Sequence, residues 1–229
     1  MATLDQNPMW LGHAIQSCLL QEFPPKEIII VTLKEDSNLG ILRAMQAQMR
    51  GASWEEMLRI VIAEKANPYS QRNVGLKKAR GDLVSFIDSD DVLLPSKLWL
   101  EASVLVQRDA SLVYTNFFYG DEHMNIIGTY KHEGYSRAEL RRHCCVPDYF
   151  LAPRKVWEEI GYMETEYQSA AVYDALLKIA ERYEGGIIYR RTPTWIYRQR
   201  RGQLSQTEAL DPSQLERRNE VLRLHYERC

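Results

Sequence analysis

One apolar stretch that ends on a cluster of acids limits the fold of this chain most. Leu83 to Ile87 has the length and the residues of a β-strand, and the carboxylates of Asp88, Asp90 and Asp91 follow it directly. Open α/β sheets bind their ligands at the carboxyl ends of strands. Three neighbouring acids repel one another, and a bound Mg²⁺ or Mn²⁺ would offset that repulsion. A solvated acidic turn that caps the next helix is the alternative.

Strand and helix patterns alternate through the first half of the chain. The β-branched run over residues 27–31 is continuous, which is typical of a strand covered on both faces in a parallel sheet. The predicted strands cover 27–31, 58–63 and 83–87, and the predicted helices 8–21, 39–49, 71–80 and 95–107. This order predicts an α/β fold with a mostly parallel central sheet flanked by helices, connected by right-handed crossovers.

The second half has a less regular pattern, which predicts a mixed arrangement of strands and helices. Gly161 stands at the position where a helix commonly ends. The predicted strands cover 112–119, 149–151, 187–189 and 194–197, and the predicted helices 136–142, 153–160, 172–182 and 212–226. No repeat or low-complexity linker divides the 229 residues, so we expect a single domain over residues 1–229.

Composition excludes several classes of protein. The formal net charge of -2 gives no reason to expect binding to nucleic acid. The four cysteines lack metal-ligand spacing and read as thiols in a reducing compartment. No apolar stretch approaches the ~20 residues of a membrane span, and no signal peptide is evident. These features predict a cytoplasmic protein without a membrane span, with peripheral membrane contact left open.

The order of several segments resembles the family 2 glycosyltransferases of the GT-A fold. The matching segments are 10–17, 27–31, 71–82, 86–91, 95–98, 156–163 and 197–198. The resemblance implies transfer of a sugar from a nucleotide-diphosphate donor, with a UDP-sugar expected first, to an acceptor hydroxyl, usually with inversion. It also implies a nucleotide-sugar-binding half over 1–95 and an acceptor-side half over 96–229. Glycan, lipid-linked and protein acceptors all remain open.

The resemblance implies a donor site with four contributing segments. Asp88 and Asp90 match the family's DxD motif, which contacts the ribose or metal and coordinates Mg²⁺ or Mn²⁺. Thr3 falls near the nucleoside. Arg72 falls in a turn close to the donor, where it could pair with phosphate, although a surface role is an equal alternative. Arg200 takes the place of a metal-binding histidine, within a basic cluster that also holds Arg190, Arg191, Arg198 and Arg201.

Three positions depart from the family pattern. The family's first strand is reduced here to residues 1–4. After the second strand the family commonly has an acidic pair that reads the base, and residues 32–36 stand there in this chain, where Asp36 could replace that acid only through a shifted loop. The family's catalytic aspartate falls in register at residues 171–172, which are Ala and Val. Asp174 is therefore the candidate base, with a helix-cap or first-turn role as the alternative. Glu164 and Glu166 are further candidates.

These features support three hypotheses. The first is a metal-dependent, inverting glycosyltransferase. The second is a degenerate GT-A domain that binds nucleotide or a partner without transferring sugar, which the residues at 171–172 motivate. The third and most remote is a phosphohydrolase of the haloacid dehalogenase type, because Asp88-x-Asp90-x-Val92 follows an apolar strand. That motif usually opens its domain, whereas here it comes after three predicted strand–helix units.

Overall fold

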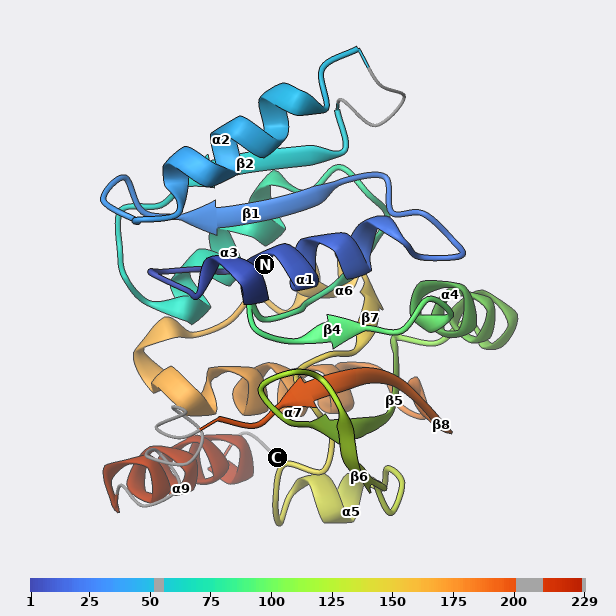
Figure 1. Cartoon of the computed structure of the whole chain (residues 1–229). Helices are drawn as coiled ribbons and strands as arrows, with labels where there is room; N and C mark the ends of the chain where they lie inside the picture. Colours follow the sequence, from blue (N-terminus) through green and yellow to red (C-terminus); the bar gives the residue numbers. More distant parts are fainter. Residues whose placement is uncertain (52–55, 201–211, 228–229) are drawn as a thin grey trace.

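The computed structural model describes residues 1–51, 56–200 and 212–227 of the chain (Figure 1). The helices are α1 (Pro8–Leu19), α2 (Leu39–Gln48), α3 (Pro68–Lys78), α4 (Lys97–Arg108), α5 (Arg137–Leu140), α6 (Arg154–Glu159), the 3₁₀ helix η1 (Thr165–Ala170), α7 (Ala171–Arg182) and α9 (Pro212–Glu227). The strands are β1 (Ile28–Thr32), β2 (Leu58–Ile62), β3 (Leu83–Ser85), β4 (Val92–Leu93), β5 (Leu112–Gly120), β6 (Ile126–Tyr130), β7 (Leu151–Pro153) and β8 (Ile187–Arg198).

The strands form two separate sheets. Strands β1 and β2 pair in parallel, with Ile28 opposite Leu58. The second sheet has the order β3-β7-β5-β8-β4, with β6 added to β5. Within it, β5 and β8 are parallel, and the other pairs are antiparallel. The expected α/β architecture is present, but β3 pairs antiparallel with β7 and forms no pair with β1, so the parallel sheet expected for the first half is interrupted.

Local capping explains where the helices of the first half begin. The Asn7 side chain accepts a hydrogen bond from the Met9 amide at 2.9 Å, and Asn67 accepts one from the Ser70 amide at 2.8 Å. In both cases a proline follows the asparagine at the first helical position. The cap at Asn67 starts α3 three residues earlier than the sequence pattern predicted. Gly161 ends α6 with a φ of 79°, as expected.

Four strands differ from the prediction, and one of them, β7, begins at Leu151, two residues later than predicted. The two strands predicted over 187–189 and 194–197 are one continuous strand, β8. Register shifts in its pairing with β5, near Asn116, accommodate Pro193, which lacks an amide donor. Strands β4 and β6 were not predicted, because β4 has two residues and β6 is largely exposed.

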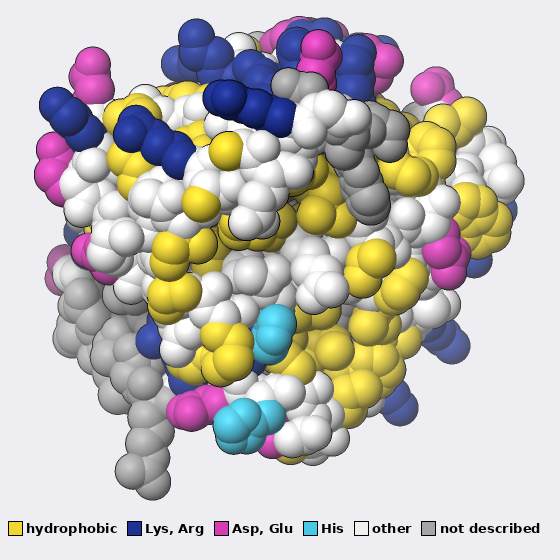
Figure 2. Space-filling view, turned by 45° about the horizontal axis from the view of Figure 1, so that its top comes forward, with side chains coloured by type: hydrophobic (Ala, Val, Ile, Leu, Met, Phe, Trp, Pro, Cys, Tyr) yellow, Lys and Arg dark blue, Asp and Glu magenta, His cyan; other side chains and the backbone are white. Residues whose placement is uncertain are grey.

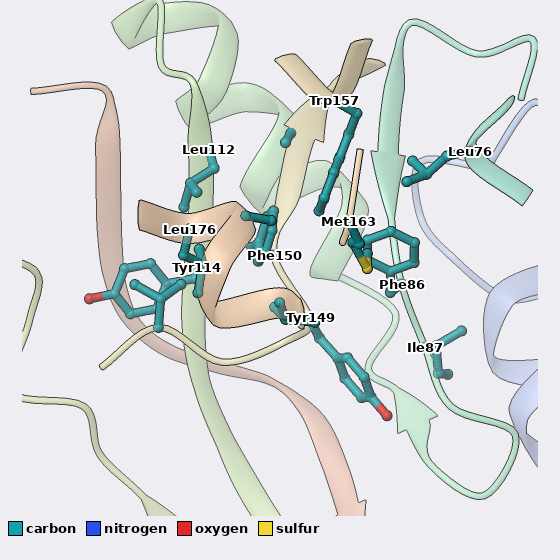
Figure 3. Close-up of a cluster of buried hydrophobic side chains, with 14 of the residues drawn as sticks. Leu76, Phe86, Ile87, Leu112, Tyr114, Tyr149, Phe150, Trp157, Met163 and Leu176 are labelled. Carbon is teal, nitrogen blue, oxygen red and sulfur yellow. The ribbon is translucent and has the colours of Figure 1, made fainter. Parts of the chain in front are cut away.

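An aromatic core joins the strand that carries the acids to the second half (Figure 3). Phe86, directly after β3, meets Trp157 of α6 edge to face, with ring centroids 5.2 Å apart. Phe150, just before β7, stacks on the Trp157 ring, with the ring centroids 5.5 Å apart. Trp157 is fully buried. Because this packing comes from distant segments, it fixes the end of β3 against the rest of the molecule.

The visible surface mixes both signs of charge. Figure 2 shows Lys and Arg side chains mainly along the upper edge of one face, with acidic side chains between them and hydrophobic ones over the middle. Exposed hydrophobic residues include Ile126, Ile127 and Tyr130 of β6. No helix within the described ranges is both long and apolar enough to cross a membrane.

Candidate donor site

The acids follow β3 in a loop that several distant elements hold. Phe86 and Ile87 are buried and anchor the loop in the core. Asp91 is 1 % exposed, whereas the side chain of Asp88 is 44 % exposed and that of Asp90 is 13 % exposed. The fully buried Asp91 is therefore placed to support the loop, Asp90 is largely buried beside it, and Asp88 is the acid most open to a ligand.

Arg72 of α3 joins two acids. Its guanidinium lies 2.8 Å from Asp88 Oδ1 and 2.9 Å from Asp148 Oδ2, and its side chain is 5 % exposed. Burial opposes ionisation of both partners, but Arg72 and Asp88 favour each other's charged form, which raises the pKa of Arg72 and lowers that of Asp88. The alternative of a surface role for Arg72 is wrong, because the side chain is buried beside the acidic loop.

Asp91 is the anchor of the loop. It accepts hydrogen bonds from the Tyr149 hydroxyl at 2.7 Å and from the Arg198 amide at 2.8 Å. Burial and then the charges of Asp90 and Asp88 raise the pKa of Asp91 well above its ordinary value. The Tyr149 oxygen also accepts the Asp88 amide hydrogen at 2.9 Å. A single tyrosine thus holds both ends of the acidic turn.

Tyr149→Phe should therefore destabilise the fold. The change leaves the buried Asp91 carboxylate and the Asp88 amide each without one partner, which costs about 2 kcal/mol. A loss of that size lowers the melting temperature by about 4 to 8 °C in a chain of this length. Differential scanning calorimetry should show this decrease and no comparable one for Tyr130→Phe, since Tyr130 is 42 % exposed. Equal melting temperatures for both variants would contradict the anchoring role.

Asp90 is harder to ionise than its neighbour Asp88. Burial and then the nearby charge of Asp88 raise its pKa, against the opposing effect of Arg200, whose Nε lies 3.3 Å from Asp90 Oδ2. Arg200 thus lies beside the acidic pair. Arg190 and Arg191 are exposed earlier on β8, and Arg201 lies outside the described residues.

The chemistry of the loop fits a hard divalent cation. Asp88 is held ionised beside Asp90, whose own ionisation it opposes, and the two carboxylates supply oxygen ligands of the kind that Mg²⁺ and Mn²⁺ bind. No group of three or more His, Cys, Asp or Glu side chains in the described part of the chain is arranged to hold a metal. Asp88 and Asp90 therefore suit a site that a phosphate-bearing ligand would complete.

Thr3 and Asp36 lie at the carboxyl end of β1. Ala2 forms a parallel bridge with Val31, and the Thr3 amide donates to the Val31 carbonyl at 3.0 Å. The Thr3 hydroxyl is buried and has no hydrogen-bond partner among the residues described. Asp36 accepts hydrogen bonds from the Thr32 hydroxyl and, at 2.8 Å, from the Asn38 amide. It also accepts one from the Asp5 amide at 3.3 Å, so the Asp36 carboxylate ties the segment after residue 4 to the loop after β1.

Asp174 lies in a separate cluster of charges. The carboxylate is in a side chain 4 % exposed, 2.8 Å from Lys178 Nζ and 3.0 Å from His225 Nε2 of α9. Lys178 also pairs with Glu164 at 3.1 Å, and Glu166 is exposed. Residues 171 and 172 are buried in the core. The partners of Asp174 come from α7 and α9, and not from the acidic loop.

His225 should make the docking of α9 depend on pH. Burial lowers its pKa, but hydrogen bonds to Asp174 and to Glu181, at 2.6 Å, raise it above 6.5 overall. Protonated His225 therefore stabilises the fold, and this contribution is fully present below pH 6.5. It is lost as the pH rises through the pKa of His225 in the folded state. Lys178 also faces Asp174, and it stays charged across this range.

The melting temperature of the wild type should therefore exceed that of His225→Gln most at about pH 6, and the difference should shrink toward about pH 9. Circular dichroism melts of both proteins across this range measure the difference. His143→Gln is the control, because the His143 side chain, just after α5, is half exposed and lies 3.7 Å from its acidic neighbour Glu139. The variant should therefore show little dependence of the difference on pH. A difference for His225→Gln that grows with pH would contradict this assignment.

Several residues of these clusters were not identified from the sequence, among them Asp148, Tyr149 and His225. Asp148 and Tyr149 lie outside any of the matched segments, and their roles depend on contacts with residues about 60 to 76 positions away. His225 lies on a helix whose charged composition gave no sign of a buried partner. The only local signal for Tyr149 was an aromatic residue next to an acid, Asp148, at the start of an apolar segment.

Known proteins resemble this chain in sequence and in fold. A family model described as Glycosyl transferase family 2 matches residues 5–163. An uncharacterized glycosyltransferase of Methanocaldococcus jannaschii is 26% identical over 177 residues, which are 74% of this chain and 51% of the relative. The chain spans about half the length of this relative and of a Haemophilus influenzae relative, and less than a fifth of several others.

Two solved structures show the same fold. S. aureus TarS in complex with UDP-GlcNAc matches with a TM-score of 0.76 and 19% identity, over 98% of this chain and 63% of that one. The mannosyltransferase PcManGT from Pyrobaculum calidifontis, in complex with GDP-Man and Mn²⁺, matches with a TM-score of 0.67 and 15% identity. The match covers 99% of this chain and 61% of PcManGT. The predicted GT-A fold is confirmed by this likeness.

Proposed function

Because the chain belongs to glycosyl transferase family 2, we propose that it binds a nucleotide-diphosphate sugar at the loop of Asp88 and Asp90 and transfers the sugar to an acceptor hydroxyl. The observation that carries this proposal is the pair of neighbouring carboxylates after β3, an exposed one at Asp88 and a largely buried one at Asp90, in a loop held by the buried Asp91 and by Tyr149. A loop held in this way needs little reorganisation when a charged ligand binds.

In this proposal a divalent cation, Mn²⁺ or Mg²⁺, is held by Asp90 and Asp88. When bound, it offsets the charge that develops on the leaving nucleoside diphosphate. Arg72 keeps Asp88 ionised and oriented, and Arg200 is placed to contact a phosphate oxygen. Thr3 would contact the nucleoside, and its buried hydroxyl without a partner among the described residues is available for a hydrogen bond. The presence of Mn²⁺ with GDP-Man in one structural neighbour supports the cation.

The donor class follows from the neighbours and from the family. Relatives in fold bind UDP-GlcNAc and GDP-Man, and we favour a UDP-sugar for this chain, with inversion at the transferred carbon. The acceptor hydroxyl would belong to a glycan, a lipid-linked saccharide or a protein. The proposed setting is the cytoplasm, including the surface of a membrane. Family membership favours sugar transfer over the phosphohydrolase hypothesis.

A binding-only domain is the second candidate, and the environment of Asp174 favours it. As a general base, Asp174 would need an accessible carboxylate within hydrogen-bond reach of the acceptor hydroxyl. Its carboxylate instead pairs with Lys178 and His225. If Asp174 is nevertheless the base, Asp174→Asn would abolish transfer while donor binding remains.

Donor turnover separates the two candidates. The full chain is incubated with UDP-GlcNAc, UDP-glucose or GDP-mannose and Mn²⁺, and the released nucleoside diphosphate is measured with and without added saccharide acceptors. A transferase releases diphosphate with one donor faster than the Asp90→Asn variant does. Binding of a nucleoside diphosphate without release above that variant, for every donor and acceptor, would favour the binding-only domain.

A further inference from the structure

Trp10, in the first turn of α1, meets two arginines at the end of β8. The guanidinium carbon of Arg198 lies 5.0 Å from the centre of the indole ring, and that of Arg200 lies 5.5 Å from it. Both distances are within the range of a cation–π contact, in which the electron-rich face of a ring attracts a cation. One half-buried aromatic side chain thus holds two cations that would otherwise repel each other.

The position of the indole is set by the attachment of α1 to β4, beside which it lies in Figure 1. The Leu93 amide donates to the Ser17 hydroxyl at 3.1 Å, and Gln21 Nε2 donates to the Leu94 carbonyl at 2.9 Å. Ser17 and Gln21 are both buried. Trp10 and Ser17 are two helical turns apart, so they share the face of α1 that meets β4. Buried hydrogen bonds therefore fix the surface on which the arginines rest.

The two arginines differ in what they can contact. Arg198 is fully buried, and its Nε donates to the Asp90 carbonyl at 2.6 Å while its amide donates to Asp91. The side chain of Arg200 is 29 % exposed, and its Nε lies 3.3 Å from Asp90 Oδ2. Arg198 thus supports the acidic loop from within, whereas Arg200 is the arginine that a ligand at the loop can reach.

Arg200 needs a support other than Asp90 in the proposed donor site. There the Asp90 carboxylate is a ligand of the divalent cation, so the cation competes with Arg200 for it. The indole is a support for which the cation does not compete. Contact with a ring face also leaves the N–H donors at the edge of a guanidinium available for hydrogen bonds to phosphate.

We propose that Trp10 is a positioning residue of the donor site, where its indole holds the Arg200 guanidinium at the acidic loop so that it meets a phosphate oxygen of the donor. The inference rests on the proposed donor site and adds a residue of α1 to it. A side chain that is already held when the ligand arrives loses less conformational freedom on binding, which raises affinity. Trp10 therefore acts on binding through Arg200 and not by its own contact with the nucleotide.

The test is a double-mutant cycle of wild type, Trp10→Leu, Arg200→Met and the double variant. Isothermal titration calorimetry measures the binding of UDP and of GDP with Mn²⁺ to each protein. Trp10→Leu should weaken binding of the nucleotide that the wild type prefers by about 5-fold, the equivalent of one cation–π contact. In the Arg200→Met background the same change should weaken binding by less than about 2-fold, because the guanidinium that the indole holds is gone.

Two further variants separate positioning from a general loss of structure. Trp10→Phe keeps an aromatic face and should recover most of the affinity that Trp10→Leu loses. Trp99→Leu makes the same replacement at a tryptophan on α4 that is 56 % exposed, and it should bind like the wild type. If Trp10→Leu does not fold, Trp10→Met takes its place in the cycle, because the flexible methionine side chain adapts to the space of the indole.

A second measurement reads the position of Arg200 without a nucleotide. The NMR resonance of the Arg200 Nε–H group, assigned by its absence in Arg200→Met, should lie further upfield in the wild type than in Trp10→Leu, because the ring current of the indole shields protons near its face. An Arg200 resonance that Trp10→Leu leaves in place would overturn the proposal.

The titrations distinguish failure of this inference from failure of the donor site. If the wild type bound a nucleoside diphosphate and Trp10→Leu weakened binding equally with and without Arg200, the role of Trp10 would be wrong and the donor site would stand. If the wild type bound neither UDP nor GDP, the donor site would be wrong and the role of Trp10 would be wrong with it.

Discussion

Asp90→Asn is expected to weaken Mn²⁺-dependent binding of a nucleoside diphosphate by about 100-fold, since a contact to a charged group is worth up to about 3 kcal/mol. The same change should leave the melting temperature unchanged or slightly higher. Burial and the charge of Asp88 raise the pKa of Asp90, so its ionised form destabilises the folded state at neutral pH. Loss of the ion pair with Arg200 offsets part of that gain.

Binding is measured by isothermal titration calorimetry and stability by scanning calorimetry. Asp109→Asn is the matched control, because Asp109 is exposed and has a φ of 49°, a conformation that asparagine also accepts. The control should bind like the wild type. If Asp90→Asn bound the nucleotide as tightly as the control does, the assignment of Asp90 as a metal ligand would be wrong.

Arg72→Met is expected to reduce both stability and donor binding. The side chain is 5 % exposed and joins two carboxylates, and removal of one member of a buried ion pair costs about 3 to 5 kcal/mol. Asp88 and Asp148 are 44 % and 43 % exposed and can regain water, so the lower end, about 3 kcal/mol, applies. That loss corresponds to a decrease of about 6 to 12 °C in melting temperature.

Arg80→Met provides the comparison for Arg72→Met. Arg80 also pairs with an acid, Glu27 at 3.2 Å, but its side chain is 50 % exposed. A pair so exposed contributes about 0 to 1 kcal/mol. Denaturant unfolding of both variants measures the difference directly. Equal losses of unfolding free energy would show that Arg72 is not the buried centre of the acidic loop.

The sequence was sufficient where one segment carries its own signal. The β-branched run at 27–31 and the apolar run before Asp88 are strands β1 and β3, within one to two residues at their ends. The acidic loop was identified from its residue types and Arg72 from the family resemblance, and the structure places the Arg72 guanidinium 2.8 Å from Asp88. Short-range patterns of this kind decide local structure because strand and helix periods differ.

The parts that failed depend on contacts between distant residues. The antiparallel pairing of β3 with β7 joins segments almost 70 positions apart, and no local pattern specifies the direction of such a pair. Tyr149 is 58 positions from Asp91, and His225 is 51 from Asp174. A tyrosine or histidine on an ordinary segment gives no sign of the partner that tertiary packing brings to it.

The most direct test of the donor site is a calorimetric titration of the wild-type chain with UDP and with GDP, each with Mn²⁺ and with EDTA. We expect one nucleoside diphosphate to bind in the presence of Mn²⁺, and EDTA to abolish this binding. Saturation at a hundredfold excess over Kd should also stabilise the fold by about 2.7 kcal/mol. Failure of both nucleotides to bind, or binding that persists unchanged in EDTA, would contradict a metal-dependent donor site at Asp88 and Asp90.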